Sequence, residues 1–280
     1  MKKLLLLGLV LILALSAFAL TGCGGDDAAT TDDHAESTDL EDTAALDPEV
    51  QAIKDRGVLR VGVKSDVPGF GILNPATNEF EGLEIEMARA LAKDIIGDEN
   101  AVEFTPVTAD TRGTLLDNGQ IDMVIATFTI KPERLEQWNF SEVYYTDAVG
   151  LLVNADAGIK SLADLDGKKI GVALSATSKD AVEAAGAENG HAFEFVEFAS
   201  YPEISTALAA GQVDAFSVDK SILRGYLNAD RVLLDDEFSP QDYGIATKLS
   251  NTGLAAFVDA FVSRIKTDGS LQGWIDANNI

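Results

Sequence analysis

Leu-Leu-Asp-Asn-Gly-Gln-Ile-Asp at positions 115–122 and Ala-Leu-Ala-Ala-Gly-Gln-Val-Asp at positions 207–214 are two copies of one pattern. In each copy a helix ends at a glycine, a polar residue turns the chain, and a buried strand follows. Val61-Gly62-Val63 is echoed in the same way by Ile170-Gly171-Val172. The repetition predicts two similar α/β lobes rather than one long sheet. The alternative is chance similarity between two ordinary helix–glycine–strand units.

The remainder of the chain after residue 47 alternates short β-branched runs with amphipathic helical runs, which is typical of α/β proteins. The expected strands are 59–64, 102–107, 123–126, 170–173, 193–198 and 215–218. The expected helices are 83–96, 112–118, 177–185, 201–210 and 221–227. Open parallel sheets bind ligands beyond the carboxyl ends of their strands, so the polar residues at these ends are the candidate site.

Composition and charge exclude several classes of function. The 280 residues are 46% hydrophobic, which excludes a wholly disordered chain, and carry 21 Lys and Arg against 46 Asp and Glu. The net charge of −25 makes nucleic acid an unfavourable partner. One cysteine excludes an intrachain disulfide framework, and two histidines leave little for metal or triad chemistry. We therefore expect no metal, no cofactor and no catalytic residue.

The amino terminus has the pattern of a secretory signal. Lys2 and Lys3 precede an apolar run that ends at Leu20-Thr21-Gly22-Cys23, which resembles a bacterial lipobox. A transmembrane anchor of about 20 residues is the alternative. We expect 1–22 to be a lipoprotein signal peptide and Cys23 to be lipidated, anchoring an extracytoplasmic protein to the cell membrane. Residues 23–47 carry nine acidic residues and no Lys or Arg, which predicts a disordered acidic tether.

Several motifs resemble those of the bacterial extracellular solute-binding proteins of family 3. They are Val61-Gly62-Val63-Lys64-Ser65-Asp66-Val67-Pro68, Gly82-Leu83-Glu84-Ile85-Glu86, Ala126-Thr127-Phe128-Thr129-Ile130-Lys131-Pro132-Glu133-Arg134 and Gln241-Asp242-Tyr243-Gly244. Within the family, Lys64, Arg112 and Tyr201 make the chain most similar to aspartate/glutamate-binding proteins of the major cell-binding factor type. The resemblance covers essentially the whole chain after residue 47.

The resemblance implies a two-lobe clamp of the type II periplasmic-binding-protein kind with two hinge crossings. Lobe 1 would comprise 48–143 and 243–280, lobe 2 would comprise 149–238, and the hinge would comprise 144–148 and 239–242. Such a clamp closes on its ligand and delivers it to the permease of an ABC importer. We expect the protein to act as a monomer.

The resemblance also implies a role for each residue that binds an α-amino acid. Arg134, Thr129 and Thr177 would bind the α-carboxylate, with the first amides of a helix behind Thr177. Asp219 and Thr127 would accept hydrogen bonds from the ammonium group. The alternatives without a role in binding are a surface arginine at 134, an ordinary helix start at 177 and a helix cap at 219.

The side-chain contacts decide which amino acid is bound. By the same resemblance Lys64, Arg112 and Tyr201 would bind the ligand's side chain, and Phe70 would lie on its face. Two cations in a closed cleft need an anion between them, which favours aspartate or glutamate. Ordinary packing of Phe70 and a solvated Lys64 are the alternatives. With no histidine in the site, the sequence predicts an affinity that changes little between about pH 5.5 and 8.

Other functions stay open at this point. A neutral polar ligand such as glutamine or cystine is the first alternative. An adhesion role and a cyclohexadienyl dehydratase-like enzyme follow. The enzyme would need a general acid in the cleft, and Asp66 is the one carboxylate that the sequence offers for it.

Overall fold

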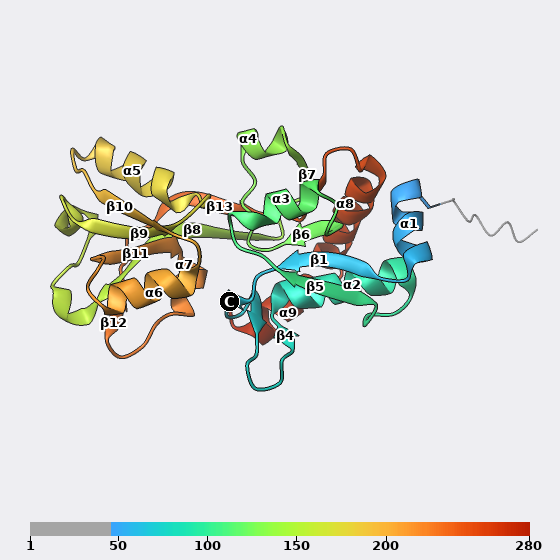
Figure 1. The fold of residues 1–280 in the computed structure, drawn as a ribbon, viewed down its shortest axis with the longest axis horizontal. Helices are drawn as coiled ribbons and strands as arrows, with labels where there is room; N and C mark the ends of the chain where they lie inside the picture. The colour runs from blue at the N-terminus through green and yellow to red at the C-terminus, as the bar shows by residue number, and fades with distance from the viewer. Residues whose placement is uncertain (1–45) are drawn as a thin grey trace, which may run out of the picture. The chain divides into compact units, whose positions relative to one another are not determined.

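The computed structural model describes residues 46–280. The predicted signal peptide, Cys23 and all but the last two residues of the predicted tether lie outside these residues. No helix within 46–280 is long and apolar enough to span a membrane. The described part is built on two mixed sheets flanked by helices, so the α/β prediction is confirmed (Figure 1).

The first sheet has the strand order β5-β1-β6-β14-β7, and β1 pairs in parallel with both β5 and β6. Its strands are β1 (Leu59–Val63), β5 (Val102–Pro106), β6 (Met123–Ile125), β7 (Trp138–Phe140) and β14 (Ala246–Lys248). The helices are α1 (Pro48–Arg56), α2 (Leu83–Ile96), α3 (Thr111–Asp117), α4 (Pro132–Leu135), α8 (Thr252–Thr267) and α9 (Ser270–Asn278). A small sheet follows β1 and consists of β2 (Asp66–Val67), β3 (Gly71–Leu73) and β4 (Phe80–Glu81).

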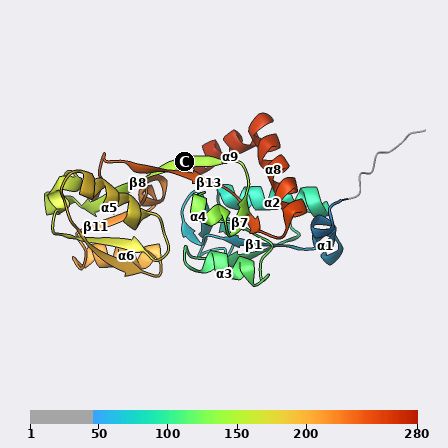
Figure 2. The ribbon, with the colours of Figure 1, turned by 90° about the horizontal axis from the view of Figure 1, so that it is seen from above.

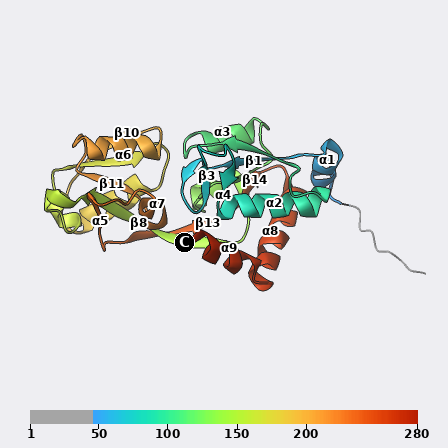
Figure 3. The same cartoon turned by 90° about the horizontal axis from the view of Figure 1, so that it is seen from below.

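Different helices pack against the two faces of the first sheet. On β6, Met123 and Ile125 join the core cluster that contains α2, whereas Val124 and Ala126 join the cluster of Leu116 on α3. This is the period of two that a strand covered on both faces requires. Figure 3 shows α2 and α3 on opposite sides of β1.

The second sheet repeats the plan. Its order is β10-β9-β11-β8-β12, and β9 pairs in parallel with β10 and β11. The strands are β8 (Tyr145–Asn154), β9 (Lys169–Ala173), β10 (Glu194–Phe198), β11 (Ala215–Asp219) and β12 (Arg231–Leu233). The helices are η1 (Ala155–Ala157), η2 (Leu162–Leu165), α5 (Ser178–Glu188), α6 (Tyr201–Ala209) and α7 (Lys220–Arg224).

The repeated sequence pattern has a structural cause. In both lobes its final aspartate accepts a main-chain N–H at the start of the neighbouring parallel strand. Asp122 accepts from Arg60 at 2.8 Å, and Asp214 accepts from Lys169 at 2.9 Å. The same side-chain chemistry therefore joins β6 to β1 in the first sheet and β11 to β9 in the second.

Two strands run between the sheets. β13 (Phe238–Tyr243) pairs antiparallel with β8, and the register joins Tyr243 to Tyr145 and Gln241 to Asp147. Figure 2 shows this ribbon between the two groups of elements. The predicted hinge segments 144–148 and 239–242 fall on it or directly beside it. The exact lobe boundaries stay a prediction.

Candidate amino-acid site

The predicted ligand residues lie at strand ends and helix starts that face one another. Lys64 follows β1, Thr127 and Thr129 follow β6, and Asp219 ends β11. Eight of the nine are buried, and Arg134 is partly exposed. The buried ones are Lys64, Phe70, Arg112, Thr127, Thr129, Thr177, Tyr201 and Asp219. Burial of so many polar groups where residues from the two sheets come together is typical of a binding site.

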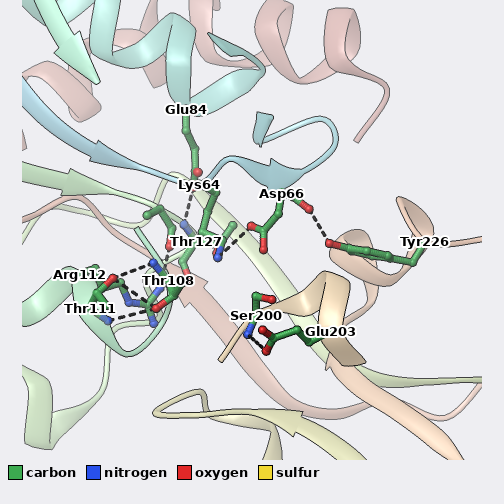
Figure 4. Close-up of polar contacts among 11 residues, drawn as sticks. Lys64, Asp66, Glu84, Thr108, Thr111, Arg112, Thr127, Ser200, Glu203 and Tyr226 are labelled. Atoms are coloured by element: carbon green, nitrogen blue, oxygen red, sulfur yellow. Dashed lines mark hydrogen bonds and ion pairs between the residues drawn. The ribbon is translucent and has the colours of Figure 1, made fainter. Parts of the chain in front are cut away.

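Lys64 has a partner of its own. Its Nζ lies 3.1 Å from Oδ1 of Asp66 (Figure 4). The same atom lies 4.4 Å from the centre of the Tyr201 ring. Its side chain is 2% exposed, and this burial lowers the pKa of Lys64 while Asp66 opposes the shift. Asp66 is therefore the partner of Lys64. Of the two cations predicted to bind the ligand's side chain, Lys64 already has a carboxylate beside it.

Arg112 holds the main chain at the end of β6. Its Nη1 donates to the carbonyls of Ala126 at 2.7 Å and Thr127 at 3.1 Å, and its guanidinium lies 3.9 Å from the centre of the Phe128 ring. Burial lowers the pKa of Arg112. Within the described residues its Nε is buried without a hydrogen-bond partner. A ligand oxygen is the kind of group that would satisfy this donor.

Two threonines, one from each sheet, meet on a residue that the sequence analysis missed. Gln241 Oε1 accepts from the hydroxyls of Thr129 at 2.9 Å and Thr177 at 2.6 Å. Gln241 lies on β13 and is fully buried. The two contacts join positions 112 and 64 residues apart in the chain. The presence of Gln241 in the quoted family motif was the available signal.

Arg134 connects the same two regions. Its Nη1 donates to the carbonyl of Thr129 at 2.8 Å, and its Nη2 donates to that of Ser175 at 3.2 Å. A cavity of about 440 Å³ borders Arg134, Phe128 and Thr177. Burial lowers the pKa of Arg134 to about 9, so it stays a cation at neutral pH. A larger cavity of about 700 Å³ lies along α5. Neither hollow is lined by Lys64, Arg112 or Asp219, so the buried charges and not the cavities mark the site.

Asp219 is the acceptor on the second sheet. Its carboxylate is buried and accepts a hydrogen bond from the hydroxyl of Tyr243 on β13. Burial raises the pKa of Asp219 to about 7, against the opposing effects of Tyr243, Arg112 and Arg134. A cation placed beside Asp219 would restore its ionised form.

Phe70 packs in the aromatic cluster of the hinge ribbon. The centre of its ring lies 5.1 Å from that of Tyr145 and 5.8 Å from that of Tyr243, both in edge-to-face geometry. Phe70 is fully buried. Its contact with a ligand stays a prediction. Within residues 46–280 no group of three or more His, Cys, Asp or Glu residues is arranged to hold a metal ion.

The two lobes also touch beside the site. Ser175 Oγ donates to Asp110 Oδ1 at 2.7 Å, and Tyr226 donates to the carbonyl of Asp66 at 2.7 Å. Three cations, two carboxylates and several hydroxyls therefore line a site between two α/β lobes. Such a set can bind a small zwitterion, with donors for carboxylates and an acceptor for an ammonium.

Proteins of similar sequence are receptors for amino acids. The chain is 41% identical over 244 residues to the glutamine-binding protein of Geobacillus stearothermophilus, covering 85% of this chain and 90% of that one. It is 36% identical to the ABC transporter glutamine-binding protein GlnH of Bacillus subtilis, covering 96% and 94%. It is 30% identical to the glutamate-binding protein GluB of Corynebacterium efficiens, covering 80% and 79%.

Solved structures show the same fold. The solute receptor for L-cysteine of Neisseria gonorrhoeae matches with a TM-score of 0.75 and 28% identity, covering 82% of this chain and 92% of that one. The ancestral amino-acid-binding protein AncCDT-1, a precursor of cyclohexadienyl dehydratase, matches with a TM-score of 0.72 and 29% identity, covering 81% and 98%. The two-lobe type II fold is thereby confirmed. The family model for bacterial extracellular solute-binding proteins, family 3, matches residues 59–276, and the chain belongs to this family.

Proposed function

We propose that the protein is the solute-binding component of an ABC importer for an acidic amino acid, glutamate or aspartate. The observation that carries the acidic specificity is the balance of buried charge. Lys64, Arg112 and Arg134 face the carboxylates of Asp66 and Asp219, which leaves one positive charge in excess. A dicarboxylic amino acid carries one net negative charge, and an unbalanced buried charge costs several kcal/mol.

The charge of Glu84 decides whether this balance holds. Glu84 is buried next to the cluster, and burial raises the pKa of its carboxyl, favouring the uncharged form. The hydrogen bonds from Tyr144 and Thr127 act in the opposite direction. The proposal counts Glu84 as protonated, and counts Lys64 as charged because the carboxylate of Asp66 lies beside it. An ionised Glu84 would cancel the excess and favour a ligand without net charge.

The proposed contacts divide the ligand into three parts. Arg134, Thr129 and Thr177 would take the α-carboxylate, with the two hydroxyls turning from Gln241 toward the ligand. Asp219 and Thr127 would take the ammonium. Arg112, Lys64 and Tyr201 would take the side-chain carboxylate. This division is an assignment by family resemblance, and the burial of all these groups except the partly exposed Arg134 supports it.

Glutamine is the second candidate ligand. Lys64 and Asp66 place a cationic donor beside an anionic acceptor, and a carboxamide offers an oxygen and an N–H₂ group to such a pair. The relatives named for glutamine, at 41% and 36% identity, also favour this candidate.

Delivery and location complete the proposal. A lipid on Cys23 would hold the protein on the outer side of the cell membrane, where a monomer would meet the permease. The family, described as extracellular, and the relative named for an ABC transporter support an extracytoplasmic transport role. We propose no catalysis, since Asp66, the carboxylate considered for a general acid, is paired with Lys64.

The amino acid that co-purifies with the protein tests the proposal. The protein lacking residues 1–22 is purified without added amino acids, denatured, and its released ligand identified by mass spectrometry. We expect glutamate or aspartate. Glutamine would favour the second candidate. If the protein emerges empty and its melting temperature responds to no amino acid in a full panel, amino-acid binding itself is refuted.

A further inference from the structure

Glu84 is a buried carboxylate to which the assigned ligand contacts give no role. It lies in the first turn of α2, and its exposed fraction is 0%. Its Oε1 accepts the main-chain N–H of Thr127 and the hydroxyl of Tyr144, each at 2.6 Å. Its Oε2 is buried without a hydrogen-bond partner among the described residues. A buried carboxyl group is costly unless it is hydrogen-bonded, and the two hydrogen bonds of Glu84 go to the site and to the hinge.

One of these contacts holds the ligand loop. Thr127 has φ +44°, in the left-handed region where a β-branched residue is a rare outlier. Its peptide groups are held on both sides: Glu84 takes the N–H, and Arg112 donates to the C=O at 3.1 Å (Figure 4). A strained conformation of this kind survives only when the surroundings over-determine it. Glu84 thus fixes the main chain at the tip of β6.

The other contact holds the hinge ribbon. Tyr144 directly precedes β8, and its main-chain N–H donates to the carbonyl of Tyr243 on β13 at 3.0 Å. The hydroxyl of Tyr243 in turn donates to Asp219. The chain of contacts runs from Thr127 through Glu84 and Tyr144 to both crossing strands and then to Asp219. The two residues assigned to the ligand's ammonium are thereby joined through one carboxylate.

We propose that Glu84 is a positioning residue for ligand capture, which holds the Thr127 loop in its strained form and ties it to the hinge strand through Tyr144. The inference rests on the proposed function, since it concerns the same site. Because Glu84 acts on the part of the site that meets the α-amino end, its loss should affect every amino acid alike. It should leave the ranking of ligands unchanged.

The test compares Glu84→Ala, Glu84→Gln and the matched control Glu86→Gln. Glu86 lies two residues along α2 and is exposed, so the same chemical change there leaves the site untouched. Each variant is titrated calorimetrically with glutamate, aspartate, glutamine and asparagine, and its unfolding is measured separately. Glu84→Ala should weaken every ligand that the wild type binds about tenfold or more, by a common factor, since it leaves the buried N–H of Thr127 without an acceptor.

Rescue by the conservative variant separates positioning from mere support of the fold. Glu84→Gln keeps an acceptor oxygen for Thr127 and Tyr144, so its affinities should stay within about threefold of wild type even where its melting temperature falls. A folded Glu84→Ala that binds within threefold of wild type would overturn the proposal. So would a Glu84→Gln that binds as poorly as Glu84→Ala.

Tyr144→Phe keeps the test decisive if Glu84→Ala does not fold. It removes one donor from the same oxygen without touching Thr127, and we expect about a threefold to tenfold loss common to all ligands. An unchanged affinity of Tyr144→Phe would overturn the claim that Glu84 acts on binding through its hydrogen bond with Tyr144. Wild-type protein that binds no amino acid would instead refute the proposed function, which the same titrations show separately.

Discussion

Ligand affinity should fall steeply as the pH drops below 7, because Asp219 must be ionised to accept an ammonium. Burial raises the pKa of this carboxyl to about 7 in the unliganded protein. A bound ammonium favours the ionised form and so lowers that pKa. The direction of the pH dependence follows. Asp219 is mostly ionised well above pH 7 and supports binding there, and binding weakens as the pH falls through 7. This replaces the expectation of a flat profile, which considered histidine alone.

The size of the effect follows from the ionised fraction of Asp219. At pH 5.5 only about one molecule in 30 has an ionised Asp219, so the apparent affinity should be about 30-fold weaker than at pH 8. This corresponds to about 2 kcal/mol of binding free energy. The other groups that face Asp219 are Tyr243, Asp147, Arg112 and Arg134. Arg134 keeps its charge over this range, since its pKa is about 9.

Calorimetry at half-unit steps from pH 5.5 to 8 measures the profile. Titrations at pH 7 in two buffers of different ionisation enthalpy should show about half a proton released per ligand bound. Asp219→Asn, which cannot titrate, is the control: it should bind more weakly and with a flat profile. A wild-type affinity that changes less than threefold over the range would refute the reasoning about Asp219.

Three further predictions concern single residues. Arg134→Ala should weaken all amino acids alike, by about 30-fold or more, because the α-carboxylate is common to them; a loss confined to one ligand class would contradict this in the same titrations. Lys64→Met should weaken glutamate at least about 30-fold more than glutamine, and equal losses would remove Lys64 from the side-chain site. Gly113→Ala should destabilise the fold by about 1–3 kcal/mol in urea unfolding, because a Cβ there would lie 2.5 Å from the Trp138 ring; an unchanged midpoint would contradict the tight packing.

Local patterns made much of the fold predictable. The glycine-ended helices and the aspartates at 122 and 214 mark the same step in both lobes, and each aspartate bonds to the strand beside the one that the pattern predicts. The candidate site could also be predicted from local patterns. Residues at the carboxyl ends of parallel strands share one edge of their sheet, so Lys64 and Thr127 on the first sheet and Asp219 on the second follow from the strand assignments.

The remainder depends on contacts between distant segments. Gln241 gains its role only when β13 brings it to Thr129 and Thr177, and Glu84 only when α2 meets Thr127 and Tyr144. The pairing of Lys64 with Asp66 depends on side-chain direction after β1, which spacing does not reveal. β2 and β4 have two residues each, too short for a detectable period.

The affinity ratio of glutamate or aspartate to glutamine on the wild-type protein tests the central claim most directly. The protein is stripped of bound ligand by unfolding and refolding, and the three amino acids are titrated at pH 8 under identical conditions. The excess buried positive charge predicts that an acid binds at least about tenfold more tightly than glutamine. Glutamine binding as tightly as either acid, or more tightly, would contradict the charge balance on which the acidic specificity depends.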